Sequence, residues 1–566
     1  MYVLGISCYY HDSAASLLRD GLLIAAADEE RFSRIKHDSS FPKKAINFCL
    51  KKANISVSDL NYVVFYEKPF VKFERLFLSS LAFSPKSFSF FRESMKKWFL
   101  DQLWIKDRII SNLGIPKWKL IFSQHHLSHV SSAYFSSPYR KSAVLSIDAV
   151  GEWTTVSWGI AENNKISLKE ELIFPHSLGL LYSAFTVFTG FEANEGEYKM
   201  MGLAPYGKPK YVEEIKKIID IKEDGSFATD LSFFSYQYSL KNIYTKKFEE
   251  LFGKINKNSS EVIAYYADIA ASMQYVLEEI LVKIVNYVHK KTNMDYLCYA
   301  GGVALNSSAN WKILNNSKFK QIFIQPAAGD SGGSLGAALW ASNTVFSCKK
   351  RFEMEHTYWG EEESEEQIET FFNKENISYK TVNNDSLLVE EIAEKMEKGK
   401  VVGWVQGRFE WGPRALGNRS ILGDPRTSKM RSLVNRKIKF REAFRPFAPS
   451  VISEKASSYF DLPEKTHPPL KYMLYVVPVK ENMRKKLGAV THVDGTARPQ
   501  LVEKNINPLY YNLISCFGKK TGIPVVLNTS FNLKGEPIVN TCGEAFSTFE
   551  RSGLDTLVVG NKVIEK

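Results

Sequence analysis

The strongest constraint on the fold is a hairpin pattern that occurs twice near the start of the chain. First, the apolar run VLGISC leads into the polar tip YYHDSAA and then into SLLRDGLLIAAADEERF, with a turn at Asp20-Gly21. Later, AVLSI leads to Asp148 and the tip AVGEW, TTVSWGI returns, and a turn at residues 162–165 precedes ISLKEELIF. Each hairpin carries an aspartate after its first apolar strand, Asp12 and Asp148, 136 positions apart.

This repetition predicts a duplicated unit, of the kind in which two ribonuclease-H-like halves hold a nucleotide between them. One acidic strand end from each half would then face the cleft. Two unrelated hairpins would produce the same pattern, so the duplication is a hypothesis at this point.

The next part of the chain alternates helices and strands. Segment 259–290 has apolar residues spaced by three and four, which predicts a long helix with Ser259 or Ser260 as its N-cap. The strand DYLCYA then ends in the turn GGVALN, with a helix from about Ser307, and IFIQPAAGDSGGSLGAALWA repeats this arrangement. Glycines at both junctions let backbone N–H groups approach a phosphate or a ribose. We therefore predict an α/β fold for this half.

The composition excludes several classes of protein. Of 566 residues, 44% are apolar and 24% are charged, which is typical of a folded globular chain. There is no run of about 18 apolar residues and no basic N-terminal leader, so we expect neither a membrane span nor a signal peptide, and a cytoplasmic location. The six cysteines lie far apart without a CxxC pair, which argues against a disulfide framework or a thiolate zinc site.

The positive charge is concentrated in one stretch. Residues 408–445 contain eleven Lys or Arg and three acids, and Gly, Pro and Asn interrupt the run. A spread-out RNA-binding face would not need these residues, so we expect a folded loop that binds a compact phosphate and no nucleic acid. Lys439 adds a point charge, and the serine of LNTS can donate a hydroxyl. The alternative is a set of structural ion pairs.

Two groups of polar residues suggest chemistry in the first half of the chain. His125 and His129 are four apart, on one face if the segment is helical, and Asp148 and Asp330 lie at strand ends that the duplicated fold would bring together. Two imidazoles and two carboxylates suit iron, manganese or zinc. His126 could replace either histidine as a ligand, although the four-residue spacing argues against this. His11 and Asp12 could supply a general base and its orienting carboxylate, or simply form an exposed turn.

Two further segments bear on the organisation of the chain. Residues 70–104 are rich in aromatic side chains with interspersed Lys and Arg, and could lie on a membrane or cover an acceptor pocket. The spacing of Phe70, Phe73 and Phe77 favours an ordinary buried helix face. Residues 342–385 turn polar and acidic, which indicates a domain boundary or an exposed lobe.

The order of the motifs resembles the O-carbamoyltransferase family of nodulation and antibiotic biosynthesis. The motifs are YHDSAA, HHLSH, DAVGEWTT, EYKMMGLAPYG, GGVALN, GDSGGSLGAA, GRFEWGPRALGNRSILGDPR, FREAFRPFAP, HVDGTARPQ and LNTSFN. The resemblance implies an α/β, actin-like ASKHA domain over residues 1–345, a connecting segment over 346–385, and an α+β domain similar to threonylcarbamoyl-adenylate synthases over 386–566. It also implies chemistry in which carbamoyl phosphate, ATP and a metal, expected to be Fe²⁺, give carbamoyl-adenylate and then an O-carbamoylated acceptor.

Carried over to this sequence, the resemblance gives each motif a role. His125, His129, Asp148 and Asp330 would ligate the metal, and His11 with Asp12 would activate the acceptor hydroxyl. The residues that would bind carbamoyl phosphate are Arg414, Lys439, Arg445, Arg498 and Ser530. Those that would bind the nucleotide are Lys199, Gly301, Gly302 and Asn306. Ala149 and the turn DSGGS depart from the family pattern, which puts loop geometry in doubt but removes no polar ligand.

Two alternatives remain open at the level of sequence. An ASKHA-type kinase of a small hydroxylated substrate would explain the hairpins and glycine turns, but neither the histidine pair nor the second domain. A tRNA-binding or tRNA-modifying protein would use the basic stretch and would show steep salt dependence. The acceptor cannot be read from the sequence, and a homodimer is an open option.

Overall fold

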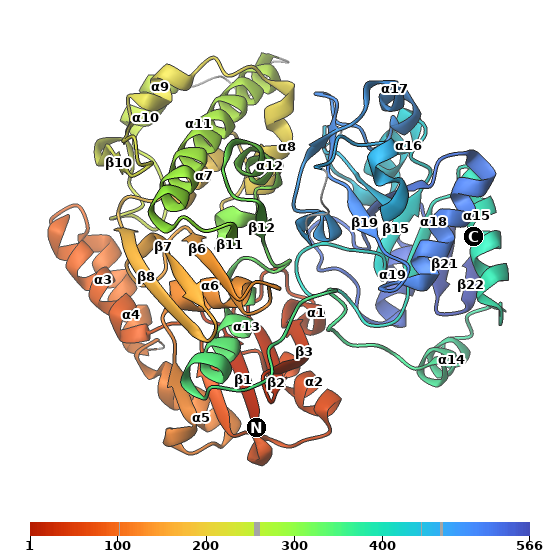
Figure 1. Ribbon diagram of the computed structural model, residues 1–566, viewed down its shortest axis with the longest axis horizontal. Coiled ribbons are helices and arrows are strands. Elements are labelled where there is room, and N and C mark those ends of the chain that lie inside the picture. The colour runs from red at the N-terminus through yellow and green to blue at the C-terminus, as the bar shows by residue number, and fades with distance from the viewer. Residues whose placement is uncertain (101, 254–260, 443, 464–467) are drawn as a thin grey trace. The chain divides into compact units, whose positions relative to one another are not determined.

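The structure is a computed structural model in which contacts divide the chain into two compact units (Figure 1). It describes residues 1–100, 102–253, 261–442, 444–463 and 468–566. The first unit comprises residues 1–10, 14–24 and 50–353, and the second comprises residues 11–13, 25–49 and 354–566. The domain boundaries expected from the sequence stay predictions.

The first hairpin forms the start of a five-stranded sheet in the order β3-β2-β1-β4-β5. β1 pairs antiparallel with β2 and parallel with β4, which in turn pairs parallel with β5. The turn between β2 and β3 places Asp20 at φ 54° and Gly21 at φ 83°, the left-handed geometry that tight hairpins favour. The strands are β1 Tyr2–Ser7, β2 Ala14–Arg19, β3 Leu22–Asp28, β4 Tyr62–Phe65 and β5 Leu120–Phe122.

A second five-stranded sheet repeats this topology. Its order is β8-β7-β6-β11-β12, where β6 pairs antiparallel with β7 and parallel with β11, and β11 pairs parallel with β12. The predicted duplication in a mixed α/β fold is therefore confirmed. The strands are β6 Lys141–Ile147, β7 Thr154–Glu162, β8 Lys165–Ile173, β11 Tyr296–Ala300 and β12 Gln321–Phe323.

The two hairpin aspartates are not equivalent, contrary to our expectation. Asp148 directly follows β6, so it lies at the end of a strand. Asp12 lies at the far side of its hairpin tip, shortly before β2 begins at Ala14, and Cys8 is the residue that directly follows β1. The apolar pattern located both hairpins but could not show which tip residue stands at the strand end.

The helices that follow the last strand of each sheet pack against each other. These are α6 (His125–Tyr134) after β5 and α13 (Asp330–Trp340) after β12. A Cβ atom built on Gly336 would lie 1.8 Å from the Ser128 carbonyl oxygen, so only glycine permits this approach of the two backbones. The close packing fixes the ends of both helices relative to each other.

The remaining helices of the first unit include the long helix that the apolar spacing predicted. The long helix predicted over 259–290 is α11, Glu261–Thr292, and its predicted N-caps, Ser259 and Ser260, lie outside the described residues. A short two-stranded sheet pairs β9 (Ile219–Ile221) with β10 (Phe227–Thr229). The other helices are α3 Pro69–Ala82, α4 Phe88–Leu100, α5 Ile105–Leu113, α7 Leu178–Phe188, α8 Glu197–Leu203, α9 Val212–Lys216, α10 Lys246–Phe252 and α12 Ser307–Asn316. Helix α2, Lys43–Ala53, belongs to the second unit up to residue 49 and to the first unit from residue 50.

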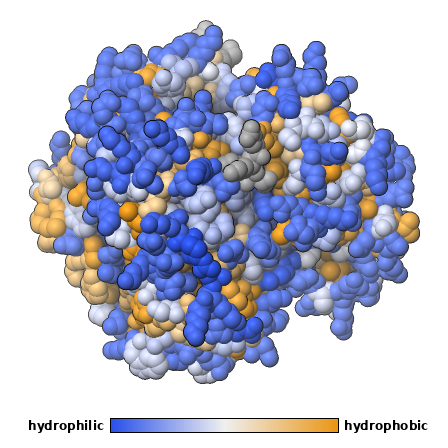
Figure 2. All heavy atoms as spheres, viewed as in Figure 1, coloured by the Kyte–Doolittle hydropathy of each residue, from blue (hydrophilic) through white to orange (hydrophobic). Residues whose placement is uncertain are grey.

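The aromatic segment forms α3 to α5, but much of its apolar surface is exposed. Phe70 is 67% exposed and Phe77 is 38% exposed, so the prediction that they belong to a buried helix face is wrong for both. Trp98 and Phe90, on α4, are the buried aromatic anchors. Figure 2 shows hydrophobic side chains gathered over α3 and α4, at the left of the view.

The second unit is built on an eight-stranded mixed sheet in the order β13-β22-β21-β14-β15-β20-β16-β19. Trp404 on β14 packs in a core with Tyr510 and Phe517, from helix α18 (Pro508–Thr521). The strands are β13 Lys380–Thr381, β14 Val402–Val405, β15 Arg419–Gly423, β16 Ala448–Ile452, β19 Gln500–Val502, β20 Val525–Ser530, β21 Thr556–Val559 and β22 Lys562–Glu565.

Helices and a small two-stranded sheet complete this unit. β17 (Val477–Pro478) pairs antiparallel with β18 (Thr496–Ala497). The helices are α1 Glu30–Ser33, α14 Glu365–Lys374, α15 Asp385–Glu397, α16 Ser428–Val434, α17 Glu481–Arg484, α18 Pro508–Thr521 and α19 Cys542–Glu550.

Two expectations from composition can be compared with the structure. All six cysteines are free thiols. Among the helices of the described residues, none is long and apolar enough to span a membrane.

Candidate functional site

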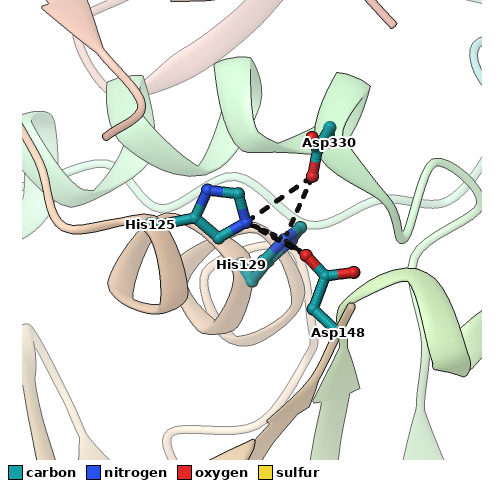
Figure 3. Close-up of side chains that lie close together, drawn as sticks. All are labelled: His125, His129, Asp148 and Asp330. Atoms are coloured by element: carbon teal, nitrogen blue, oxygen red, sulfur yellow. Dashed lines mark hydrogen bonds and ion pairs between the residues drawn. The ribbon is translucent and has the colours of Figure 1, made fainter. Parts of the chain in front are cut away.

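Four predicted side chains meet in the first unit and form what we call the histidine–aspartate group: His125, His129, Asp148 and Asp330 (Figure 3). The two histidines lie one turn apart on α6, Asp148 follows β6, and Asp330 is the first residue of α13. One nitrogen or oxygen atom from each side chain lies within 4.8 Å of the others, and all four residues are buried. The packing of α6 against α13 and β6 therefore brings together residues that are distant in sequence.

The distances in this group favour a bound cation. The Nε2 atoms of His125 and His129 are 3.0 Å apart, and Asp148 Oδ2 lies 3.1 Å from the first and 3.4 Å from the second. Asp330 Oδ1 is 3.6 Å from both nitrogens. Two nitrogens that face each other cannot both use their lone pairs without a proton or a metal between them. The donor set is one that a divalent transition metal accepts, so the residues fit the expected ion.

The electrostatics of the group reflect this convergence. Burial alone would lower the pKa of both imidazoles, but hydrogen bonds to Asp148 outweigh it and raise the pKa of His125 and of His129. Burial would raise the pKa of Asp148, yet hydrogen bonds from the same two rings hold it well below its ordinary value. Without a metal, protons on the imidazoles balance the carboxylates, and a divalent cation would replace them.

Two glutamates that the sequence reasoning missed surround His125. Glu67 Oε2 lies 3.4 Å from His125 Nδ1, and Glu67 also pairs with Lys72 at 2.9 Å. Burial would raise the pKa of Glu67, but Lys72 and His125 lower it to about 2. Glu152 accepts the backbone N–H of His125 at 3.0 Å. Such outer carboxylates fix the orientation of ligating imidazoles. Glu67 follows the apolar strand β4, the same signal that had pointed to Asp148.

His126 belongs to a different environment, as the helical spacing predicted. Its Nδ1 atom lies 2.9 Å from the Ser157 hydroxyl oxygen, and it is not part of the group of four. Burial, followed by the charges of His125 and His129, holds its pKa well below the ordinary value, so it remains neutral.

The predicted nucleotide-binding residues lie in three settings in the same unit. Gly301 has φ 93° and Gly302 donates its backbone N–H to Asp148 Oδ1 at 3.1 Å, so this turn supports the histidine–aspartate group. Asn306 caps α12 by accepting the Ala309 N–H at 3.0 Å. Its side chain also exchanges hydrogen bonds with Gln274. Lys199, on α8, lies 3.9 Å from Glu195.

His11 and Asp12 form a three-membered group with His37, a residue that the sequence reasoning missed. His11 Nδ1 lies 2.9 Å from Asp12 Oδ2, and His37 Nδ1 lies 2.7 Å from Asp12 Oδ1. The two ring centroids are 4.8 Å apart. Burial would raise the pKa of Asp12, but hydrogen bonds from both imidazoles hold it well below its ordinary value. Asp12 is therefore a carboxylate that two rings share.

The second unit contains what we call the cationic group: Arg414, Lys439, Arg441, Arg445 and Arg498. Burial and then the charges of Arg414, Arg441 and Arg445 hold the pKa of Arg498 well below its ordinary value. Burial and the charges of Arg441 and Arg445 do the same to Lys439. Like charges that depress one another's ionisation form a site for an anion, because an anion removes their repulsion. Arg441 was absent from the sequence prediction although its motif, FREAFRPFAP, was identified.

Lys439 is the buried centre of this group. It ends a π-helical turn, Asn435–Lys439, and its Nζ atom donates to the Ser530 carbonyl oxygen at 2.6 Å and to Asn532 Oδ1 at 2.7 Å. The Ser530 hydroxyl lies 3.2 Å from Nζ and donates to Asn532 Oδ1 at 2.7 Å. These acceptors are neutral dipoles, so they orient Nζ without cancelling the positive charge that it carries when protonated.

Another side chain next to this group was not predicted. His492, in the motif HVDGTARPQ, lies 3.0 Å from the Thr496 hydroxyl through Nδ1. Burial lowers the pKa of its ring to about 4, helped by Arg498 and Arg431 and opposed by Asp494. His492 therefore stays neutral near the arginines and adds no charge of its own.

Comparisons with known proteins agree over nearly the whole chain. A family model described as the carbamoyltransferase N-terminus matches residues 2–339, and one described as the carbamoyltransferase C-terminus matches residues 393–566. An uncharacterized protein of Synechocystis sp., sll1178, is 45% identical over 100% of this chain and 97% of its own length.

Two relatives have more informative names. Nodulation protein NolNO of Sinorhizobium fredii is 36% identical over 99% of this chain and 79% of its own length. The 3′-hydroxymethylcephem-O-carbamoyltransferase of Amycolatopsis lactamdurans is 35% identical over 47% of this chain and 48% of its own length.

Proposed function

Because the chain belongs to the carbamoyltransferase family, we propose that it is an ATP- and metal-dependent O-carbamoyltransferase that moves the carbamoyl group of carbamoyl phosphate to a hydroxyl. Membership confirms the resemblance seen in the motifs. The observation that carries the finer proposal is that one chain holds two chemically different groups, the cationic group and the histidine–aspartate group. The cationic group suits the binding of carbamoyl phosphate, and the histidine–aspartate group suits the transfer of the carbamoyl group to the hydroxyl.

The cationic group would bind carbamoyl phosphate. Arg414, Arg445 and Arg498 can hold a phosphate through charge-assisted hydrogen bonds, and Lys439 adds a point charge next to the Ser530 hydroxyl. Hydrolysis of this substrate by one water molecule releases phosphate and leaves carbamate. Carbamate is unstable in water, so it must react with ATP without being released.

The second step would consume ATP. An oxygen of carbamate attacks the α-phosphate, pyrophosphate leaves, and carbamoyl-adenylate forms, in which AMP is a good leaving group. The glycine turn at Gly301 and Gly302 and the N-terminus of α12 are the expected nucleotide side, with Lys199 as a further phosphate contact. We retain residues 1–345 and 386–566 as the two domains that would divide these tasks.

The final step would be transfer to the acceptor. A divalent metal held by His125, His129, Asp148 and Asp330 would supply Lewis-acid chemistry when bound. His11 would take the proton of the acceptor hydroxyl through Nε2, while Asp12 holds its Nδ1–H and stabilises the charged ring. The hydroxyl oxygen then bonds to the carbamoyl carbon, and AMP leaves.

The name of one relative supports a hydroxyl as the acceptor. That relative acts on a hydroxymethyl group, and the name of another refers to nodulation. We propose a small molecule or a glycan as the acceptor for this chain, and a cytoplasmic location where ATP and carbamoyl phosphate are available.

The test is to incubate the protein with ATP, labelled carbamoyl phosphate, Fe²⁺ and a panel of glycosides. We expect mass spectrometry to show a gain of one carbamoyl group, together with AMP, pyrophosphate and phosphate. ADP with a phosphorylated acceptor would instead indicate a kinase. Binding of tRNA with steep salt dependence, and no small-molecule product, would indicate the RNA-binding alternative.

A further inference from the structure

Asp12 is held at both carboxylate oxygens, each by a different imidazole. His11 Nδ1 contacts Oδ2 at 2.9 Å and His37 Nδ1 contacts Oδ1 at 2.7 Å. His37 lies in the loop that follows α1 and is fixed by the first residue of that helix: its backbone N–H donates to Glu30 Oε2 at 2.9 Å, and Lys36 pairs with the same glutamate. A φ of 54° at His37 turns the backbone so that the ring reaches Asp12.

This group differs from the histidine–aspartate group in what its nitrogens face. In the histidine–aspartate group, two ring nitrogens face each other at 3.0 Å, an arrangement that needs a proton or a metal between them. Here, each ring nitrogen faces a carboxylate oxygen, which a single N–H hydrogen satisfies. The contacts of Asp12 are therefore those of a proton-handling group, although two histidines and an aspartate could also be read as metal ligands.

The other nitrogen of His37 defines its protonation. Nε2 is buried, and the structure gives it no hydrogen-bond partner among the described residues. A charged ring would have to bury an unpaired, charged N–H at this position, which costs more than burying a neutral lone pair. The ring proton therefore belongs on Nδ1, where Asp12 accepts it, and His37 is a neutral donor.

We propose that His37 is a positioning residue for acceptor activation: it orients the Asp12 carboxylate by a neutral hydrogen bond and leaves the full negative charge of Asp12 to His11. This rests on the proposed function, in which His11 is the base. The proton of the acceptor hydroxyl moves to His11 Nε2, the Nδ1–H of His11 stays on Asp12, and His37 neither gains nor loses a proton. A charged His37 would compete for Asp12 and would repel the imidazolium formed on His11.

Two substitutions separate a positioning role from a structural one. His37→Leu removes the donor, whereas His37→Asn retains a short N–H donor where Nδ1 was. With carbamoyl-adenylate as the donor, we expect His37→Leu to lower kcat by about tenfold to a hundredfold without raising KM, because a small misplacement of a catalytic group costs up to about a hundredfold in rate. His37→Asn should recover most of the rate. His176→Leu, which removes a partly buried imidazole bonded to Thr229, is the matched control and should retain activity.

Equal loss of kcat in His37→Leu and His37→Asn would overturn the proposal. A second measurement does not depend on activity. It therefore still tests the proposal if the variants fold poorly or if the wild-type protein transfers no carbamoyl group. In wild-type protein with ¹⁵N-labelled histidine, at pH 7.5, His37 should give the signals of the neutral Nδ1–H tautomer. Signals of an imidazolium or of the Nε2–H tautomer would overturn it, as would a second equivalent of metal that His37→Leu loses.

Failure of the proposed function is distinguishable from failure of this inference. If wild-type protein transfers no carbamoyl group to any acceptor, the reaction is wrong, while the tautomer of His37 still decides the inference about Asp12. If transfer occurs and His11→Ala is fully active, His11 is not the base, and the positioning role proposed for His37 is wrong as well.

Discussion

Single residues decide whether the histidine–aspartate group holds a metal or only protons. His125 and His129 offer two Nε2 atoms at 3.0 Å, whereas His126, on the same helix, is directed to Ser157. Three neighbouring imidazoles in one buried helix thus differ in what they face. This difference provides an internal control for the metal assignment.

The first prediction concerns metal content. His125→Ala and His129→Ala each remove one of two imidazole donors, so the affinity for the divalent metal, and with it the metal content, should fall by more than about tenfold. Loss of a residue that only orients a metal ligand already costs that much affinity. His126→Asn should retain its metal because its ring lies outside the group. Elemental analysis of folded protein, with circular dichroism as the check on folding, measures both. A His125→Ala, His129→Ala double variant with full metal content would contradict the assignment.

The second prediction concerns the proton balance of Lys439. Burial and the neighbouring Arg441 and Arg445 lower its pKa far below the unfolded value of about 10.4. Without a ligand, stability therefore rises with pH between the folded and unfolded pKa values of this lysine. A bound dianion raises the folded pKa again. Binding should take up a proton, and affinity should fall as pH rises through this range.

Sulfate is the suitable probe for that prediction because it carries two charges throughout the range. Calorimetric titrations in two buffers of different ionisation enthalpy give the number of protons taken up. Lys439→Met should abolish the uptake, whereas Lys437→Met, at an exposed position in the same turn, should leave it intact. The same uptake in Lys439→Met as in the wild type would show that another group carries the proton.

At the level of elements, the turn after β11 connects the fold to the site. Gly301 has φ 93°, and a Cβ atom there would lie 2.2 Å from the Ile147 carbonyl oxygen. Gly301→Ala should cost more than about 2 kcal/mol, from both strain and collision, and should lower metal content, because the turn carries the N–H that holds Asp148.

Gly114→Ala is the control for backbone strain alone. Gly114 has φ 65° and no atom within 4 Å of the added carbon, so its substitution should cost about 1 kcal/mol and leave the metal bound. Urea unfolding and elemental analysis measure both variants. Equal losses of stability in the two would mean that the collision at Gly301 is relieved elsewhere.

Local signals explain which elements could be predicted. The duplicated hairpins, the helix α11 and the two strand–helix turns each depend on a period or a glycine within a short window, and all were found. The spacing of His125 and His129 is also local, because residues four apart share a helix face. Solvent exposure depends on tertiary packing and cannot be predicted from a short window. The spacing of Phe70 and Phe77 defines a face of α3, but it does not show whether another element covers that face.

Side chains that act through tertiary contacts could not be predicted in the same way. Glu67 reaches His125, and His37 reaches Asp12, only because separate elements pack together. Arg441 shares a motif with Arg445, and only the structure distinguishes it as a member of the cationic group. Hydrogen-bond partners of this kind have no sequence period, so the sequence indicated the ligands and missed what orients them.

At the level of the whole molecule, the chain does not divide at a single point. Residues 11–13 and 25–49 belong by contacts to the second unit, although they precede most of the first unit in sequence. A truncation near residue 345 would therefore separate His11 from the rest of its own unit. The two half-reactions have to be separated by point variants of the full chain.

The last prediction uses such variants to test whether the two half-reactions use separate groups. Arg445→Ala weakens the cationic group that would bind carbamoyl phosphate, so it should be inactive with carbamoyl phosphate and ATP. It should still use carbamoyl-adenylate that is supplied directly. His11→Ala should show the reverse pattern: it should still release phosphate from carbamoyl phosphate but fail to carbamoylate the acceptor from either donor, because the hydroxyl proton has no acceptor.

The measurements for this prediction are phosphate release, AMP formation and mass gain of the acceptor, made on the same preparations. Lys437→Met serves as the control for a lost positive charge, since it lies on an exposed part of the same basic stretch. Each active-site variant should lose one half-reaction and retain the other. If both folded variants lose both half-reactions equally, the whole reaction would take place in a single composite site. Removing Arg445 would then also stop transfer to the acceptor, and removing His11 would also stop the release of phosphate.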